Sequence, residues 1–201
     1  MATEILLASR NAHKIAELSA ILEPQLPGVT VSGDEGPEPV ENGLSFTENA
    51  LIKARECAKR TGKPAIADDS GLSVAALNGC PGIFSARWAG PARSDRDNLE
   101  LVLWQISDLA DSQRQAEFVC AAAAVIPQPD GSLREIAVLG RWEGSLLREP
   151  AGEHGFGYDP IFQPAGYEVS AAQLDPELKN QLSHRRRAFQ ALLPQLVAEL
   201  G

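Results

Sequence analysis

Two adjacent carboxylates, Asp68 and Asp69, offer the clearest chemistry in the sequence. They follow the apolar run 65–67 and precede Ser70 and Gly71. This pattern predicts a buried strand that ends at the two acids and delivers them to its carboxyl end, where open α/β sheets bind ligands. Because neighbouring carboxylates repel each other, a cation or a proton is needed between them. A strand followed by an ordinary turn explains the same residues, since Asp, Ser and Gly are common in turns.

A helix directly before this strand can supply positive charge. Residues 47–60 have a helical pattern that ends before Gly62, and we expect Thr47 to cap it. Asn49 and Lys53 lie on one face at i, i+4 spacing, so a helix packed on the strand can aim both at the carboxylates. A polar face turned to solvent is the simpler interpretation.

The first polar turn of the chain is a second candidate. Residues 4–9 read as a buried strand, and a helical pattern starts near residue 15. A helix N-terminus attracts anions, Ser9 and Asn11 can donate or cap, and Lys14 can meet a phosphate charge. The turn lacks the glycine pattern of a P-loop or a dinucleotide-binding site, so a surface turn explains it equally well.

An aromatic residue between glycines marks residues 155–162. Gly155 and Gly157 flank Phe156, so the backbone can approach a ligand while the ring is presented to it. The alternative is a turn that leads into a strand. Beyond this segment, Ser183 begins the last predicted helix, and His184 and Arg185 lie in its first turn, where basic residues oppose the helix dipole. Either a bound anion or a nearby acid such as Glu177 would offset this unfavourable interaction with the dipole.

The remaining elements complete an α/β pattern of one domain, residues 1–201, with two lobes and no separable linker. The 201 residues are 44% hydrophobic, enough for one core. We predict a strand at 29–32, a loop at 33–45, a hairpin partner at 73–77, a long loop at 78–90, a helix at 94–109, and a long hairpin of 116–126 with 133–143. Asp175 is expected to cap a helix that begins at Pro176.

Charge and cysteine content limit the partners. The net charge of −9 makes a general nucleic-acid binder improbable, because phosphate neutralisation dominates that affinity. Three widely spaced cysteines without a CxxC pair argue against disulfides or zinc and favour the cytoplasm. We find no signal-peptide pattern and no apolar run near the ~20 residues of a membrane helix, so no membrane partner is expected.

Six short stretches, taken in order, resemble one known family. The similarity extends from residue 5 to about 195, and the order of the six is more specific than any one of them. Together they resemble the Ham1-like nucleoside triphosphate pyrophosphatases. The stretches are 9–14, 45–54, 67–72, 81–87, 155–162 and 179–185.

The resemblance implies a fold and a reaction. The fold is a long, twisted mixed β-sheet flanked by helices, in two lobes with a central cleft, usually as a homodimer. The reaction is Mg²⁺-dependent hydrolysis between the α- and β-phosphates of a nucleoside triphosphate, which gives the monophosphate and pyrophosphate. The preferred substrates are the deaminated purine nucleotides ITP, dITP and XTP, and the role is cleansing of the nucleotide pool.

The resemblance also implies site residues. Asp69 matches the proton acceptor and metal-binding carboxylate, and Glu41 and Asp68 are further metal-site acids. We favour Asp69 as the base and Asp68 as a metal ligand or positioner, an assignment that the sequence leaves open. The implied substrate-binding residues are Ser9, Arg10, Asn11, Ala12, His13, Lys14, Lys53, Ser70, Phe156, Gly157, Tyr158, Asp159, Lys179, His184 and Arg185.

Three positions depart from the family pattern. Arg10 stands where the family often has glycine, and either points outward or adds a phosphate contact. Val40 precedes Glu41 where the family often has a second acid. Arg186 replaces a common glycine, and we have no interpretation of that change.

The residue types suit the implied chemistry. Mg²⁺ prefers oxygen ligands, typically one or two carboxylates with phosphates and waters. Lys14, Lys53 and Lys179 would stabilise charge on the phosphates. Arg185 and protonated His184 have donors only, so donors aimed at purine position 6 would favour a 6-oxo base over adenine. We expect Phe156 to stack on that base.

Other classes fit less well. The sequence lacks the Asp-x-Asp of haloacid-dehalogenase phosphatases, the glutamate-rich helix of Nudix hydrolases and the P-loop. A Maf-like pyrophosphatase of different base preference and a non-catalytic nucleotide-binding module remain as alternatives. Trp88 belongs to a dimer contact or to the pocket.

Overall fold

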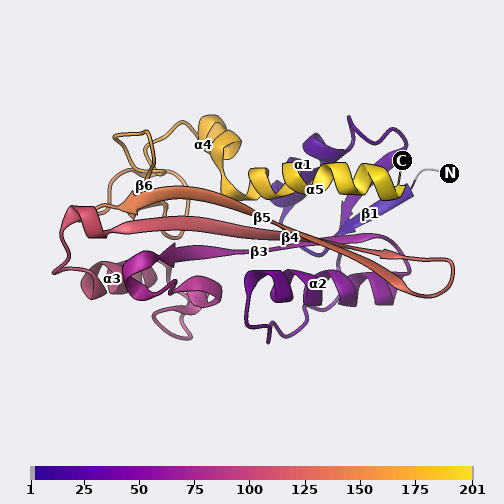
Figure 1. Ribbon diagram of the computed structural model, residues 1–201, viewed down its shortest axis with the longest axis horizontal. Coiled ribbons are helices and arrows are strands. Elements are labelled where there is room, and N and C mark those ends of the chain that lie inside the picture. The colour runs from indigo at the N-terminus through magenta and orange to yellow at the C-terminus, as the bar shows by residue number, and fades with distance from the viewer. Residues whose placement is uncertain (1–2, 201) are drawn as a thin grey trace. The chain divides into compact units, whose positions relative to one another are not determined.

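A mixed β-sheet organises the computed structural model, which describes residues 3–200 apart from the side chains of His13 and Glu17. Within that range the sheet has six strands in the order β2-β1-β3-β4-β5-β6 (Figure 1). β1 pairs in parallel with β2 and β3, and β5 pairs antiparallel with β6, which confirms the predicted mixed α/β fold. The strands are β1 Thr3–Leu7, β2 Val29–Gly33, β3 Ala65–Val74, β4 Gln115–Pro127, β5 Leu133–Leu146 and β6 Phe162–Pro164.

Local capping explains where the helices begin and end. Ser45 caps α2, because its Oγ accepts a hydrogen bond from the Glu48 N–H at 3.1 Å, so the predicted cap at Thr47 is wrong. Gly62 ends α2 in the left-handed region, at φ 68°. The predicted Asp175 cap of α4 is confirmed. The helices are α1 Ala12–Leu22, α2 Phe46–Thr61, α3 Asp95–Gln105, α4 Pro176–Leu182 and α5 His184–Leu200.

The central strand β3 differs most from its prediction. It does not end at the carboxylates but continues through Ser70 and Gly71 to Val74. Residues 73–77 are therefore no hairpin partner, since Ala75–Leu77 form a 3-10 turn. β1 pairs only with Ala65 and Ile66, so beyond them pairing with β4 on the other side carries the strand through residues that prefer turns in isolation and overrides that preference. The helix predicted at 94–109 likewise ends earlier, at Gln105.

Among the described residues, the chain divides into two compact units. Unit 1 comprises the described residues up to Asp69, then Cys120–Gly140, and the described residues from Arg185 onward. Unit 2 comprises Ser70–Val119 and Arg141–His184. The strands β3, β4 and β5 contribute to both units. The prediction of a single domain stays a prediction.

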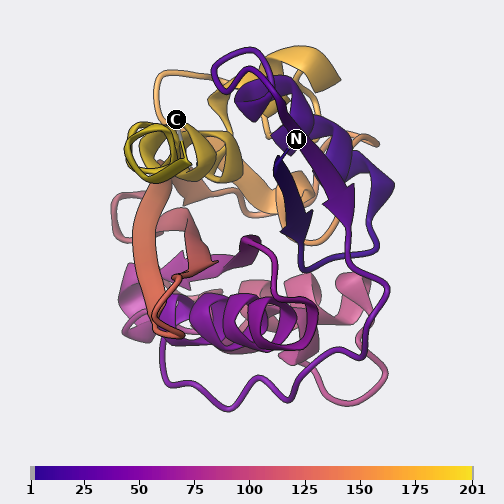
Figure 2. The same cartoon turned by 90° about the vertical axis from the view of Figure 1, so that its right-hand side faces the viewer.

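Helices cover both faces of the strands in unit 1. On one face, Leu18 of α1 and Leu192 of α5 pack with Leu7 and Ile66 in one buried cluster (Figures 1 and 2). On the other face, α2 contributes alanines that pack against alanines of the strands. The alanines are Ala50, Ala54 and Ala58 of α2 with Ala65, Ala67, Ala121 and Ala123 of the strands. Small side chains let α2 approach the sheet closely, so its polar residues reach the strand surface.

Unit 2 has its own core, which includes an aromatic cluster. The Phe118 and Phe162 ring centroids are 4.7 Å apart, and Trp142 lies 5.4 Å from Phe162. The fully buried Arg114 holds this unit together by donating to the backbone carbonyls of Leu146, Ile106 and Leu147 at 2.7–2.9 Å. The carbonyl acceptors satisfy the buried guanidinium group.

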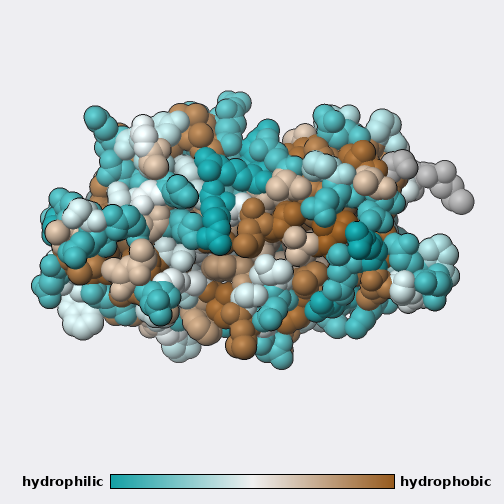
Figure 3. Space-filling view, in the orientation of Figure 1, coloured by the Kyte–Doolittle hydropathy of each residue, from teal (hydrophilic) through white to brown (hydrophobic). Residues whose placement is uncertain are grey.

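No helix of residues 3–200 is long and apolar enough to cross a membrane. The face drawn in Figure 3 is mostly hydrophilic, with apolar residues between the charged ones.

Candidate active site

The continuity of β3 separates the two carboxylates. Successive side chains of a strand point to opposite faces, so Asp68 turns toward α1 and α5, and Asp69 turns toward α2. Asp68 accepts both contacts of the Lys14 ammonium, at 2.9 and 3.0 Å, and a contact from Arg185 Nε at 3.2 Å. Its side chain is 2% exposed. The nearest cations differ for the two acids, and a cation or a proton between them stays a prediction.

Asp68 is held as a carboxylate. Burial by itself raises the pKa of this carboxyl, but the charges of Lys14 and Arg185 and the hydrogen bond from Lys14 outweigh burial. The pKa of Asp68 therefore lies well below its usual range. A carboxylate of this kind is a poor proton acceptor and a good fixed anchor for two cations.

Asp69 lies in a different environment. Asn49 Nδ2 donates to its Oδ2 at 3.2 Å, and Lys53 Nζ lies 3.5 Å from its Oδ1. The same lysine pairs with Glu41 at 2.7 Å. The predicted proximity of Asn49 and Lys53 to the carboxylates is confirmed.

The pKa of Asp69 is shifted in the opposite direction from that of Asp68. Burial raises the pKa of Asp69, and the Glu41 and Asp68 charges act in the same direction, while Lys53 and the Asn49 hydrogen bond only partly oppose them. Burial lowers the pKa of Lys53, yet Asp69 and Glu41 raise it overall, so this lysine is a firm cation. A carboxyl with a raised pKa is the better proton acceptor of the two.

The Asp69 neighbourhood has the donor set of a hard cation. Asp69 and Glu41 present carboxylate oxygens to the same ammonium group, which is the type of ligand that Mg²⁺ takes. Over residues 3–200, no group of three or more His, Cys, Asp or Glu side chains is arranged to hold a metal. The two carboxylates that face one ammonium fit a Mg²⁺ ion that takes one or two protein carboxylates together with phosphate oxygens and waters.

The first polar turn is ordered by its own side chains. Ser9 Oγ accepts from the Asn11 N–H at 3.2 Å, and Asn11 Oδ1 accepts from the Lys14 N–H at 3.3 Å. Arg10 does not simply point outward, since its guanidinium donates to the carbonyls of Glu35 and Gly36 at 2.9 and 3.0 Å. Ala12 is exposed at the start of α1. The predicted contact of His13 lies outside the described side chains.

In unit 2, the aromatic glycine segment forms an exposed platform. Phe156 is 64% exposed, and the Lys179 ammonium lies 5.0 Å from its ring centroid. The buried Asp159 accepts from the Phe156 N–H at 2.8 Å and from Lys179 at 2.5 Å. Gly155 has φ 80°, and a Cβ there would lie 2.3 Å from Asp159 Oδ2, so only glycine allows this turn.

Two residues that sequence reasoning missed fix this platform. Asp95 Oδ2 accepts from the Gly157 N–H at 2.9 Å across 62 positions of sequence. The Tyr158 hydroxyl is buried and donates to the Ser85 carbonyl at 2.8 Å. Ser85 also binds β3, because its Oγ accepts from the Leu72 N–H at 2.9 Å. Asp95 looks like an ordinary acid in the first turn of a helix, so no local pattern could have identified it.

His184 and Ser70 are further predicted site residues. His184 stacks on Phe118, with ring centroids 4.9 Å apart and an interplanar angle of 12°. Ser70 lies half-buried in β3. Their contacts with substrate stay predictions.

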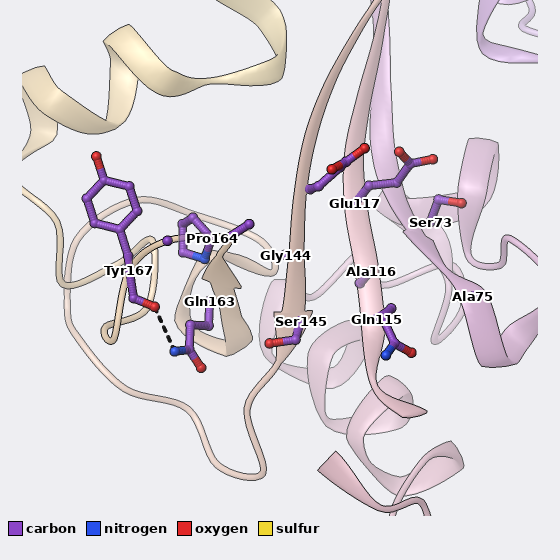
Figure 4. Close-up of a pocket in the computed structure, with 13 residues that line it drawn as sticks. Ser73, Ala75, Gln115, Ala116, Glu117, Gly144, Ser145, Gln163, Pro164 and Tyr167 are labelled. Carbon is purple, nitrogen blue, oxygen red and sulfur yellow. Dashed lines mark hydrogen bonds between the residues drawn. The ribbon is translucent and has the colours of Figure 1, made fainter. Parts of the chain in front are cut away.

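A hollow of about 600 Å³ lies elsewhere in unit 2 and contains none of the predicted site residues (Figure 4). Polar side chains from neighbouring strands line it, among them Ser73, Glu117 and Ser145. Gln163 donates to the Tyr167 carbonyl at its edge. Its lining includes the acids Glu117 and Glu143 but no basic side chain, so we assign the chemistry to Asp68 and Asp69 and their cations instead.

The fold and these charges define a class. A mixed α/β sheet carries two aspartates paired with lysines and an arginine in unit 1, and an aromatic platform with a lysine in unit 2. This is an α/β protein whose unit 1 carries cations suited to phosphate and whose unit 2 carries an exposed ring suited to stacking. The model of the Ham1 family matches residues 5–195, and the chain belongs to this family.

Named relatives and solved structures agree with the family. The dITP/XTP pyrophosphatase of Streptomyces coelicolor is 52% identical over 99% of this chain and 100% of its own. That of Leifsonia xyli is 50% identical over 96% of both chains. The HAM1 protein of Coxiella burnetii superposes with a TM-score of 0.88 at 42% identity, over 98% of this chain and 99% of that one.

Proposed function

We propose that this chain is a Mg²⁺-dependent dITP/XTP pyrophosphatase. It hydrolyses deaminated purine nucleoside triphosphates to the monophosphate and pyrophosphate, and so cleanses the nucleotide pool. The observation that carries the proposal is the Asp69 neighbourhood, where an aspartate with a raised pKa shares a lysine with Glu41. The names of the relatives at about half identity supply the substrate class.

Each residue group has a role in this reaction. Asp69 takes a proton from the attacking water, a step worth about 10²–10⁴-fold. Asp68 anchors Lys14 as a fixed positive charge for the phosphates, and it orients Arg185 for its contact with the base. Lys53 and Lys179 add further positive charge, which stabilises negative charge that develops on the phosphates. Bound Mg²⁺, held by Asp69 and Glu41, would neutralise phosphate charge.

The direct test is to incubate the full chain with Mg²⁺ and, separately, dITP, XTP, ITP, dGTP and dATP. We expect pyrophosphate and the monophosphate from the first three substrates, with dGTP and dATP turned over much more slowly. Orthophosphate as the first product would identify a phosphatase. Tight binding without turnover would identify a nucleotide-binding module, and a different base preference would favour the Maf-like alternative.

Truncation of the exposed aromatic ring tests the base platform. We expect Phe156→Ala to raise KM for dITP about 10-fold, since stacking on an aromatic ring is worth about 1–3 kcal/mol per base. Folding should be unaffected because the ring is largely exposed. Steady-state kinetics checks this, with Phe84→Ala as the control because that ring is also exposed. An unchanged KM would remove Phe156 from the base site.

Base choice has its own test in Arg185. If its donors select a 6-oxo purine, Arg185→Ala should reduce the ratio of kcat/KM for dITP to that for dATP by about 10-fold or more. We compare this ratio because Arg185→Ala also removes the contact with Asp68, and that loss should lower the activities toward dITP and dATP together. An unchanged ratio would contradict the donor account.

We further propose a cytoplasmic homodimer. Its support is the family resemblance, together with a nucleotide-pool substrate and three widely spaced cysteines without a CxxC pair. Light scattering on the purified chain should give twice the mass of 21.5 kDa. A monomeric mass would exclude the dimer.

A further inference from the structure

The side chain of Asn49 connects two parts of the Asp69 neighbourhood that are far apart in sequence. Its Oδ1 accepts from the Gly43 N–H at 2.9 Å, and its Nδ2 donates to Asp69 Oδ2 at 3.2 Å. Gly43 lies two residues after Glu41, whose carboxylate binds Lys53. Lys53 in turn contacts the other oxygen of Asp69, which closes a ring of interactions around both acids.

The chemistry of the ring fixes the orientation of the amide. A backbone N–H can only donate and an ionised carboxylate can only accept, so the Asn49 oxygen must face Gly43 and its nitrogen must face Asp69. Asn49 is 1% exposed, so it cannot exchange either contact for water without rearrangement. Among the twenty side chains, an amide of this length meets both requirements without adding charge.

The lack of a side chain at Gly43 allows its backbone to come close enough to bind Asn49. A Cβ there would lie 2.7 Å from Asn49 Oδ1 and 3.0 Å from the Asn49 nitrogen, which is too close for any other residue without a shift. The loop must therefore come this near to the start of α2 for the ring to close. A second link, from the Leu44 N–H to the Glu48 carboxylate at 2.5 Å, holds the next residue of the loop.

We propose that Asn49 is a positioning residue for both acids. By donating to Oδ2 it holds the Asp69 carboxylate with Oδ1 toward Lys53 and the reacting centre, and by accepting from Gly43 it holds the loop that carries Glu41. The inference rests on the proposed function, since it assumes that Asp69 is the base and Glu41 a metal ligand. It adds a residue outside the substrate-contacting set and explains why Gly43 and Asn49 occur together.

Three variants separate the two contacts. Asn49→Asp keeps an acceptor for Gly43 but loses the donor to Asp69. Gly43→Ala displaces the loop and keeps that donor. Asn49→Ala loses both. The control is Ser45→Ala, which removes the cap of the same helix without touching either acid and should lower the melting temperature by a few degrees.

Wild-type pyrophosphate release tests the proposed function, and the pattern of variants then tests this inference. We expect Asn49→Asp to lower kcat about 100-fold, the scale of a misdirected general base, with KM for dITP changed less than about 3-fold. We expect Gly43→Ala to weaken Mg²⁺ binding about 10-fold, measured by calorimetric titration of Mg²⁺ into the nucleotide-free protein. In Asn49→Ala both effects should appear, and adding Gly43→Ala to it should weaken Mg²⁺ binding little further.

Two results would overturn the inference. One is a folded Asn49→Asp or Asn49→Ala protein, with a wild-type circular dichroism spectrum, that retains kcat and Mg²⁺ affinity within about 3-fold of wild type. The other is a Ser45→Ala protein that loses as much kcat as Asn49→Ala, because the effect would then be general destabilisation of α2. An inactive wild-type chain whose Mg²⁺ affinity still responds to Gly43→Ala would refute the function while preserving the link between Gly43 and the metal site.

Discussion

Asp69→Asn is expected to lower kcat for dITP by about 10³-fold, the middle of the range for a positioned general base. The amide has nearly the shape of the carboxylate, but it cannot accept the proton of the attacking water. It also removes the charge that pairs with Lys53 and would bind the metal. The structure gives Asp69 this role over Asp68 because burial and the nearby Glu41 raise its pKa.

The measurement is pyrophosphate release under saturating dITP and Mg²⁺. Asp108→Asn is a matched control, because this aspartate is exposed after α3 and far from Asp69 in sequence. Thermal unfolding should show that Asp69→Asn is folded, since loss of a carboxylate with a raised pKa removes repulsion from Glu41. A variant with more than a tenth of the wild-type kcat would show that another group is the base.

Asp68→Asn is expected to act chiefly on stability. Removing one member of a buried ion pair typically costs about 3–5 kcal/mol, and we expect about 3 kcal/mol here because Lys14 and Arg185 keep some access to water. Activity should fall too, since Lys14 and Arg185 both lose their anchor. Urea unfolding followed by circular dichroism checks the free energy of unfolding.

The ion pairs of Asp68 also lead us to expect that the folded protein loses stability in acid. Its folded pKa is depressed below the value in the unfolded chain, which is about 4. The contribution of Asp68 to the free energy of unfolding is therefore fully present above about pH 4, and it is lost as the pH falls from there toward the pKa of the folded state. The wild-type protein should lose stability over this acid range more steeply than Asp68→Asn. Equal slopes for the two proteins would contradict the assignment.

The sequence predicted the kinds of residue at the site better than their arrangement. Helical spacing correctly placed Asn49 and Lys53 on the face that meets Asp69, because that spacing depends only on local geometry. The class of the fold followed from the order of strands and helices. These features are local, or periodic over one element.

Features that depend on distant partners were not predictable. Turn residues at 69–71 indicated the end of a strand, yet pairing with the neighbouring strand β4 carries β3 through them. As a result, the separate cation sets of Asp68 and Asp69 could not be foreseen. Asp95 and Ser85 act on the Phe156 platform over contacts of 62 and 73 positions, for which a single sequence holds no pattern. The substrate contacts carried over from the family stay predictions.

Because β3 runs without interruption through Asp68 and Asp69, the site depends on the number of residues before them in the strand as well as on their residue types. Because side chains alternate, deletion of one residue between 65 and 67 would move every later side chain of the strand to the opposite face. Asp69 would then lie against Lys14 and Arg185, and Ser70 would take the place facing Lys53. Both aspartates would still be present, but neither would be a base beside Glu41. At this strand, natural variation in chain length is therefore expected to be excluded more strictly than variation in residue type.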